Sequence, residues 1–332
     1  MATKLDFTLT IPKDFRFKDG IKSASVTPAL PLFQLNDRMA EISSKIQNLA
    51  SRICPEKSVN AVIYPLSRGA HHFNDVTYTF SLRPPFLETE TTHNVGLPSC
   101  FLLKPEDIPS EFKIHDIHDP RLDDDKFLKS FSEWINAVNG KYNLPLIDPT
   151  EDLAVLRDFI VSLRNPNLYE KMKDFLIGHG LNHALDENRS IFLALEDQKN
   201  INAVAIAIIV GVAVLVLSLG LIPFVTLPVI LGLASFGVVL LATSCISIRY
   251  GFGKCIEIEK KCDMGAVNAL KDASGGIYYF ENSCLKNLHR REKDPSLSND
   301  VDEKGNYLCD FSHPHLTTRI EYLQKWQSEQ AK

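Results

Sequence analysis

Apolar residues recur at steps of three and four in several stretches of the chain, a spacing that places them on one face of an α-helix. Three stretches share this pattern: residues 35–53, 127–138 and 150–163. Pro166 interrupts the third stretch, and a fourth helix is expected over residues 167–187 with Asn167 as its N-terminal cap. The pattern therefore predicts a mainly helical protein.

A different pattern lies between residues 59 and 104, where short runs rich in β-branched and aromatic residues are separated by turn-forming residues. The runs are residues 59–64, 76–82 and 99–103, and residues 276–280 form a similar run. Apolar and polar residues alternate in the second run, which is typical of a half-exposed strand. The expected fold class is therefore mainly α with a small antiparallel β-sheet (α+β).

No charged residue lies between Lys199 and Arg249. Within this run, residues 201–222 and 224–248 are each long enough to cross a bilayer as a helix, which takes about 20 residues. Helices buried in a protein core are the alternative, but such helices usually keep a polar face, which this run lacks. The run predicts a two-helix transmembrane hairpin over residues 199–248, with the lipid bilayer as a partner.

Such a hairpin would return the chain to the side of the membrane that it left. Basic residues flank both of its ends: Lys199 before it, and Arg249, Lys254, Lys260 and Lys261 after it. Because basic residues are enriched in segments on the cytoplasmic side, the expected location is a multi-pass membrane protein whose globular part is cytoplasmic.

Composition limits which partners and which cellular compartment are expected. The formal net charge is −5 and the isoelectric point is near 6.1, so nucleic acid is not an expected partner. The seven cysteines are an odd number and are scattered along the chain, which is typical of a reducing compartment and not of a disulfide framework.

Two histidines stand four residues apart on the expected fourth helix. A spacing of four brings His179 and His183 to one face of that helix, one turn apart. Two imidazoles in this geometry are typical of a His-x-x-x-His zinc site. The alternative is a histidine pair buried in a helical core.

The residues around this pair resemble the active-site helix of the HtpX-like zinc metallopeptidases, a gluzincin family that includes the CAAX prenyl proteases. The family motif is His-Glu-x-x-His, and this chain has Gly-His179-Gly180-Leu-Asn-His183-Ala. Glu259-Lys-Lys-Cys-Asp263 is similar to the family's Glu-x-x-Ala-Asp segment, and Ser-His313-Pro…Arg319-Ile is similar to its C-terminal signature. The resemblance covers roughly residues 175–323.

The resemblance implies a site and a domain plan. His179, His183 and Glu259 would hold one zinc ion, Asp263 would orient a ligand histidine, and His313 and Arg319 would lie near the site, steadying it or a bound oxyanion. The implied fold is a zincin-like metallopeptidase domain interrupted by the hairpin. Its expected boundaries are an N-terminal arm and amphipathic helix at 1–58, the metallopeptidase-like domain at 59–198 and 249–332, and the hairpin at 199–248.

One position departs from the family pattern. Gly180 occupies the place of the catalytic glutamate, which takes the proton from the attacking water and passes it to the leaving amine. The expected function is a zinc-binding, membrane-anchored metallopeptidase homologue with lost or weakened hydrolysis of polypeptides. Two alternatives stay open: an active metalloendopeptidase with an unusual base, and a non-enzymatic membrane-hairpin interaction or effector protein.

A cysteine ligand is a further alternative at the metal. Cys255 and Cys262 stand on the same expected helix as Glu259. Either thiolate could join the histidine pair and close the site as a structural zinc centre.

Overall fold

The structure is a computed structural model that describes residues 8–10, 36–55, 58–64, 79–80, 92–98, 103–141, 153–183, 253–308, 310 and 313–331. The chain divides into two compact units. The first comprises Met1–Leu185, Lys260–Cys309 and His315–Lys332, and the second comprises Asp186–Glu259 and Asp310–Pro314. The division at residue 259 falls inside one continuous helix, residues 253–270, so this single helix carries both Glu259 and Asp263.

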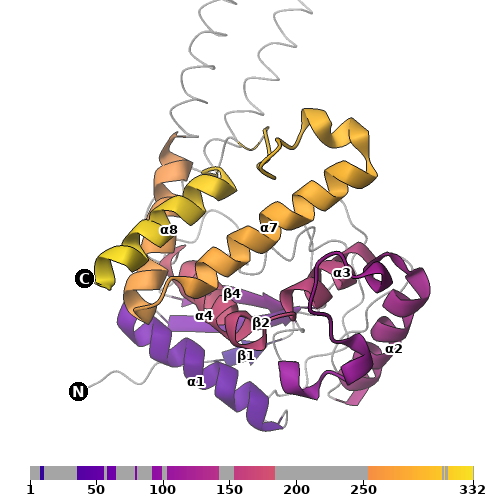
Figure 1. Ribbon diagram of the computed structural model, residues 1–332. Coiled ribbons are helices and arrows are strands. Elements are labelled where there is room, and N and C mark those ends of the chain that lie inside the picture. Colours follow the sequence, from indigo (N-terminus) through magenta and orange to yellow (C-terminus); the bar gives the residue numbers. More distant parts are fainter. Residues whose placement is uncertain are drawn as a thin grey trace, which may run out of the picture. The chain divides into compact units, whose positions relative to one another are not determined.

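Six long helices form most of the described part of the first unit (Figure 1). They are α1 (Asn36–Ile53), α2 (Asp125–Lys141), α3 (Leu153–Ser162), α4 (Pro166–His183), α7 (Ser274–Lys293) and α8 (Leu316–Gln330). Short 3₁₀ turns lie at Pro105–Asp107, Ser110–Phe112, Pro120–Asp123 and Pro295–Asn299. The helices predicted over residues 35–53, 127–138, 150–163 and 167–187 are therefore confirmed as elements.

The N-terminal cap of α4 lies two residues before the predicted one. The side-chain oxygen of Asn165 accepts a hydrogen bond from the backbone N–H of Leu168 at 3.1 Å, so Asn165 caps the helix and Asn167 does not. Pro166 is the first helical residue. Proline suits this position because the first N–H groups of a helix have no partner within the helix.

The sheet has four strands, and the predicted antiparallel arrangement is wrong. The strands are β1 (Thr8–Thr10), β2 (Ser58–Tyr64), β3 (Thr79–Phe80) and β4 (Thr92–Pro98), in the order β1-β2-β4-β3. β2 pairs parallel with both β1 and β4, and only β3 with β4 is antiparallel. Alternation along a strand indicates which face is buried but carries no information about the direction of its neighbours.

The strand predicted at residues 276–280 is also wrong, because this segment lies in the first half of α7. Its tyrosine and phenylalanine residues favour strands when considered locally. In the structure Tyr278, Tyr279 and Phe280 are buried in the helical core, and packing of this kind overrides local preference.

The transmembrane hairpin predicted from the sequence requires correction. Residues 201–222 and 224–248 lie outside the described residues. Over the ranges that the structure does describe, no helix has both the length and the apolar character needed to cross a bilayer. A helix that is apolar all round is found in protein cores as well as in membranes. Hydropathy alone therefore did not justify the assignment of a two-span membrane protein with a cytoplasmic globular part.

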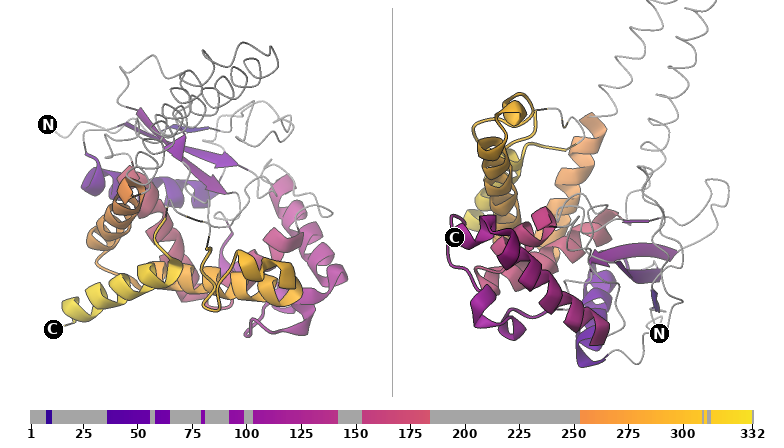
Figure 2. Two further views of the ribbon diagram at one scale, coloured as in Figure 1. Left: turned by 90° about the horizontal axis from the view of Figure 1, so that it is seen from above. Right: turned by 90° about the vertical axis from the view of Figure 1, so that its right-hand side faces the viewer.

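α4 is the central helix of the first unit. It contacts β3 and β4 on one side and α7 on another, while α8 packs on α7 and α1 packs on α4 (Figures 1 and 2). The largest fully buried side chains include Tyr169 and Phe175 of α4, Phe159 of α3 and Phe280 of α7. α4 is therefore held on several sides, which fixes the position of residues near its C-terminal end.

α7 approaches α4 closely at Gly275. A β-carbon built on Gly275 would lie 2.1 Å from the backbone oxygen of Lys171 and 2.8 Å from the backbone nitrogen of Met172. Backbone atoms cannot rotate away as the end of a side chain can. The first turn of α7 can therefore pack here only without a side chain.

We expect Gly275→Ala to lower the free energy of unfolding by about 1–3 kcal/mol, because α7 must move away from α4 to accept the methyl group. Urea denaturation followed by circular dichroism would measure the loss. Gly253→Ala is the matched control, since among the described residues, outside its own helical turn, no atom lies within 4 Å of a β-carbon at that position. Equal stability of the two variants would contradict the close approach at Gly275.

Candidate metal centre

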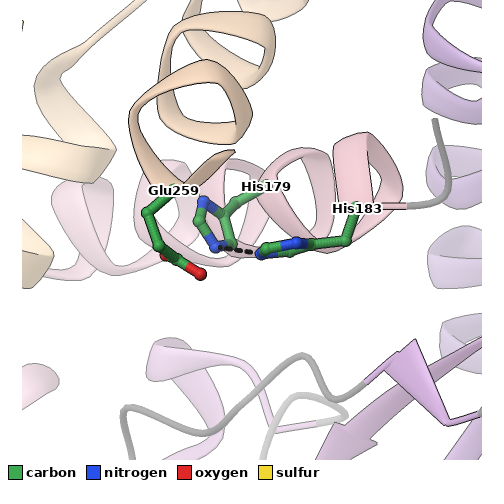
Figure 3. Close-up of side chains that lie close together, drawn as sticks. All are labelled: His179, His183 and Glu259. Atoms are coloured by element: carbon green, nitrogen blue, oxygen red, sulfur yellow. Dashed lines mark hydrogen bonds between the residues drawn. The ribbon is translucent and has the colours of Figure 1, made fainter. Parts of the chain in front are cut away.

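The two histidines lie together at the C-terminal end of α4. The Nε2 atoms of His179 and His183 are 3.0 Å apart, and the two rings are close to perpendicular, with an interplanar angle of 78° (Figure 3). Two ring nitrogens this close share either a proton or a cation. In a tetrahedral zinc site with Zn–N bonds of about 2.0–2.1 Å, two nitrogen ligands lie about 3.3 Å apart. The observed separation is close to that value.

Small residues bring the helix of residues 253–270 against this part of α4. A β-carbon built on Gly178 would lie 3.2 Å from the β-carbon of Ala266. Asn182 donates a hydrogen bond from its side chain to the backbone oxygen of Gly178 at 2.8 Å, and the same side chain occupies the space beside Gly265. The two helices therefore cross at close range next to His179.

This crossing places Asp263 beside His179. Nδ1 of His179 lies 2.8 Å from Oδ1 of Asp263, whose side chain is fully buried. A carboxylate at this distance favours the tautomer that carries its proton on Nδ1, which leaves the lone pair of Nε2 available for a metal ion. The contact therefore orients His179 toward His183.

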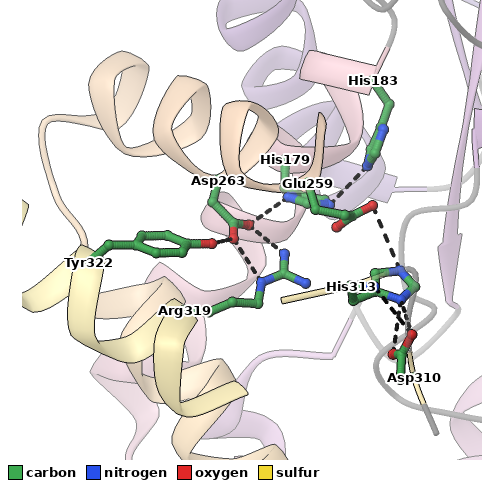
Figure 4. A network of polar contacts seen from close by, with 8 residues as sticks. All are labelled: His179, His183, Glu259, Asp263, Asp310, His313, Arg319 and Tyr322. Atoms are coloured by element: carbon green, nitrogen blue, oxygen red, sulfur yellow. Dashed lines mark hydrogen bonds and ion pairs between the residues drawn. The ribbon is translucent and has the colours of Figure 1, made fainter. Parts of the chain in front are cut away.

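Asp263 is itself held by two residues of α8 (Figure 4). Arg319 donates from Nε to Oδ2 and from Nη2 to Oδ1, both at 2.7 Å, and the hydroxyl of Tyr322 donates to Oδ2. Burial alone would raise the pKa of Asp263, but Arg319 and His179 outweigh it and hold the pKa below its usual value. Asp263 is therefore an ionised, buried carboxylate.

The groups around Asp263 are buried with it. Arg319 is 6% exposed, and its guanidinium lies 4.2 Å from the centre of the Phe280 ring. Burial, together with the charge of Asp263, raises the pKa of Tyr322, so this phenol remains a hydrogen-bond donor. The orientation of His179 thus depends on a connected set of side chains from α7, α8 and the helix of residues 253–270.

Glu259 completes a group of three possible ligands. One donor atom each from His179, His183 and Glu259 lies within 4.8 Å of the other two (Figure 3). Glu259 is one helical turn before Asp263 on residues 253–270, and it is 6% exposed. Two imidazoles and one carboxylate form the protein ligand set of many catalytic zinc sites. The chemistry of these donors therefore fits zinc.

His313 lies beside Glu259 and is held by a carboxylate of its own. Its Nε2 is 3.7 Å from Oε1 of Glu259, and its Nδ1 is 3.0 Å from Oδ2 of Asp310 (Figure 4). The backbone N–H of His313 also donates to Asp310, at 3.2 Å. The resemblance places both His313 and Arg319 near the site: His313 contacts a candidate ligand, whereas Arg319 acts one step further away, through Asp263.

Gly180 lies between the two histidines on α4 and is buried. It provides no side chain that could accept a proton. Among the described residues of this network, each carboxylate already has another contact: Glu259 belongs to the ligand group, Asp263 pairs with Arg319, and Asp310 pairs with His313. The arrangement can hold a cation, but its described acidic side chains do not replace the glutamate that the family motif places at this position.

The cysteine alternative is not supported by the geometry. Cys255 and Cys262 are buried on the helix of residues 253–270. Across the part of the chain that the structure describes, the group of side chains able to hold a metal ion contains neither of them.

Two residues of the network were not recognised from the sequence. Tyr322 follows Arg319 by three residues on α8 and therefore shares its face of the helix. Asp310 precedes His313 by three residues. The spacing was a usable signal for Tyr322, but nothing in the local sequence indicated that Asp310 would fold back onto His313.

Neither a family model, nor a curated protein, nor a solved structure matches the chain. The function of the site is therefore inferred from its own residues.

Proposed function

We propose that this chain is a zinc-binding homologue of the HtpX-like metallopeptidases in which peptide hydrolysis is lost or strongly weakened. The observation that carries the proposal is the convergence of the donor atoms of His179, His183 and Glu259, with Nδ1 of His179 against the buried carboxylate of Asp263. A histidine pair that served only as core packing would not require a buried, ionised carboxylate aimed at one ring.

The role of each residue follows from its contacts. His179, His183 and Glu259 hold the ion, Asp263 orients His179, and Arg319 and Tyr322 keep Asp263 charged and in place. When bound, zinc supplies Lewis acidity at the site. Gly180 leaves the site without a proton acceptor at the position of the family's glutamate, and the loss of such a group lowers rates by about 10²–10⁴-fold.

Metal analysis tests the proposal directly. We expect the purified protein to carry one zinc ion per chain by elemental analysis, and His183→Ala to lose it, because two remaining ligands bind zinc weakly. The matched control is His289→Ala, a histidine of α7 that contacts Asp123 and lies outside the ligand group. A wild-type protein without zinc after zinc supplementation would contradict the proposal and favour a non-enzymatic interaction protein.

A second candidate function is an active metalloendopeptidase that uses another proton acceptor. The observation that favours it is the Asp310–His313 pair, whose Nε2 atom lies beside Glu259. Cleavage assays on Gly180 variants separate the two candidates, as set out in the Discussion.

A further inference from the structure

A cavity of about 240 Å³ lies in the first unit, outside the metal centre. It is lined mainly by α3 and α7, with Met172 of α4 and the segment at Ile117 contributing to its wall. All of its lining residues are described, and the ligand group His179, His183 and Glu259 is not among them. The cavity is therefore a separate feature of the fold.

Charged side chains gather at one side of this cavity around Asp158. The Asp158 carboxylate lies 3.3 Å from Nη2 of Arg290, 3.9 Å from Nη1 of Arg157 and 3.9 Å from Nζ of Lys286. Arg157 and Lys286 both line the cavity, and Lys286 is 7% exposed. Among the described residues, three cations thus surround the carboxylate of Asp158.

The other described titratable groups near the cavity are exposed or pair with one another. Glu292 lines the cavity but is exposed at its rim. His118 is also exposed, and His289 contacts Asp123 at 3.4 Å. Asp123 itself receives a hydrogen bond from Lys293. Within the described ranges, Arg157, Lys286 and Arg290 therefore outnumber the carboxylate of Asp158 beside the cavity.

Two buried hydrogen-bond donors point to the same conclusion. Nε of Arg157 and Nδ2 of Asn282 are buried, and neither donates a hydrogen bond within the described residues. Both residues line the cavity. Buried donors without an acceptor are unfavourable, so an acceptor bound in the cavity would satisfy them.

Apart from Ser162 and Ser283, the remaining lining residues are apolar. The residues that share this character are Ile117, Val161, Met172, Tyr279, Leu285 and Leu288. A cavity of about 150 Å³ accommodates benzene, so the present volume has room for a ring and a small charged head group. A largely apolar wall with a few polar groups is typical of small-molecule sites.

We propose that this cavity binds a small organic acid. Its carboxylate or phosphate head lies against Arg157, Lys286 and Asn282, and its body, about the size of one ring, lies against the apolar wall. The head group competes with Asp158 for the cations, since Arg157 and Lys286 contact both.

Binding of defined probes tests this proposal. We expect benzoate or phenyl phosphate to bind the full chain with one-to-one stoichiometry in isothermal titration calorimetry and to raise the melting temperature. Benzyl alcohol and benzylamine, which have a similar body and no anionic head, are expected to bind at least about ten-fold more weakly, the typical value of a charged hydrogen bond. Equal binding of the uncharged alcohol, or no binding of either anion at millimolar concentration, would overturn the proposal.

Substitutions test whether the probe binds within the cavity. Lys286→Met keeps the stem of the side chain and removes its charge, and we expect it to weaken anion binding by about ten-fold or more. Lys293→Met is the control, because Lys293 is exposed on the same helix and does not line the cavity. Asp158→Asn removes the competing carboxylate and is expected to tighten binding. This second variant keeps the test decisive if Lys286→Met does not fold, because weaker binding to Asp158→Asn would contradict the proposed competition.

The metal centre is a second place where a carboxylate probe could bind. His183→Ala separates the two sites, since His183 belongs to the ligand group and does not line the cavity. Anion binding that persists in this variant supports the cavity, whereas binding that disappears with the metal assigns the anion to the metal centre and contradicts the proposal.

Discussion

Replacing Gly180 by glutamate is expected to raise the rate of peptide cleavage by about 10²–10⁴-fold over the wild-type protein. The reason is local: Gly180 follows His179 directly on α4, the position that the family motif gives to its proton acceptor. A glutamate there would take a proton from the attacking water and return it to the leaving amine. The measurement is kcat/KM on a fluorescence-quenched peptide library, with casein degradation as a second assay.

Two control variants isolate the proton transfer. Gly180→Gln has the size of glutamate without its basicity, and Gly180→Ala removes only the helix-weakening effect of glycine, about 1 kcal/mol. Both are expected to cleave no faster than wild type. Wild-type cleavage at the rate of Gly180→Glu would favour the active-peptidase candidate. An inactive Gly180→Glu that still binds one zinc ion would contradict the proposal of a degenerate peptidase.

Asp263→Asn is expected to lower the free energy of unfolding by about 3–5 kcal/mol, because it leaves the buried guanidinium of Arg319 without its counter-charge. Total stabilities are typically about 5–15 kcal/mol, so the loss would be a large share. The same change removes the carboxylate beside Nδ1 of His179, and loss of such an orienting group lowers metal affinity by about 10–100-fold. Denaturant titration and competition with a chromophoric chelator measure the two effects.

A double-mutant cycle with Arg319→Met tests the cause of this loss. If the cost comes from an uncompensated buried charge, Asp263→Asn combined with Arg319→Met destabilises by much less than the sum of the single variants. Glu321→Gln is the control, because Glu321 is an exposed carboxylate that lies between Arg319 and Tyr322 on α8. If Asp263→Asn were as stable as the wild-type protein, the proposed contribution of the buried ion pair would be contradicted. If its zinc affinity were unchanged, the role of Asp263 would be structural only.

Tyr322→Phe offers a milder test of the same network. It removes one donor to Asp263 and leaves the bidentate contact with Arg319 intact. We expect a smaller loss of zinc affinity than in Asp263→Asn, in a protein stable enough for affinity to be measured.

Predictions from the sequence succeeded where the signal was local. The 3.6-residue period depends only on neighbours along the chain, and it located α1, α2, α3 and α4. Predictions failed where a partner came from a distant segment. The direction of β2 relative to β1 and β4 depends on how remote strands meet, and residues 276–280 became part of α7 because the helical core buries their aromatic side chains.

For the candidate site, the sequence by itself determined that His179 and His183 share one helical face, since residues four apart on a helix are always neighbours. The resemblance named Glu259 and Asp263 as their companions, but only the tertiary structure decided whether these side chains meet. It brings them together because Gly178 and Ala266 let two helices cross at short range, and because α8 supplies Arg319 and Tyr322 to a buried carboxylate. Contacts of this kind depend on shape and burial across the whole unit, and no local pattern of residues encodes them.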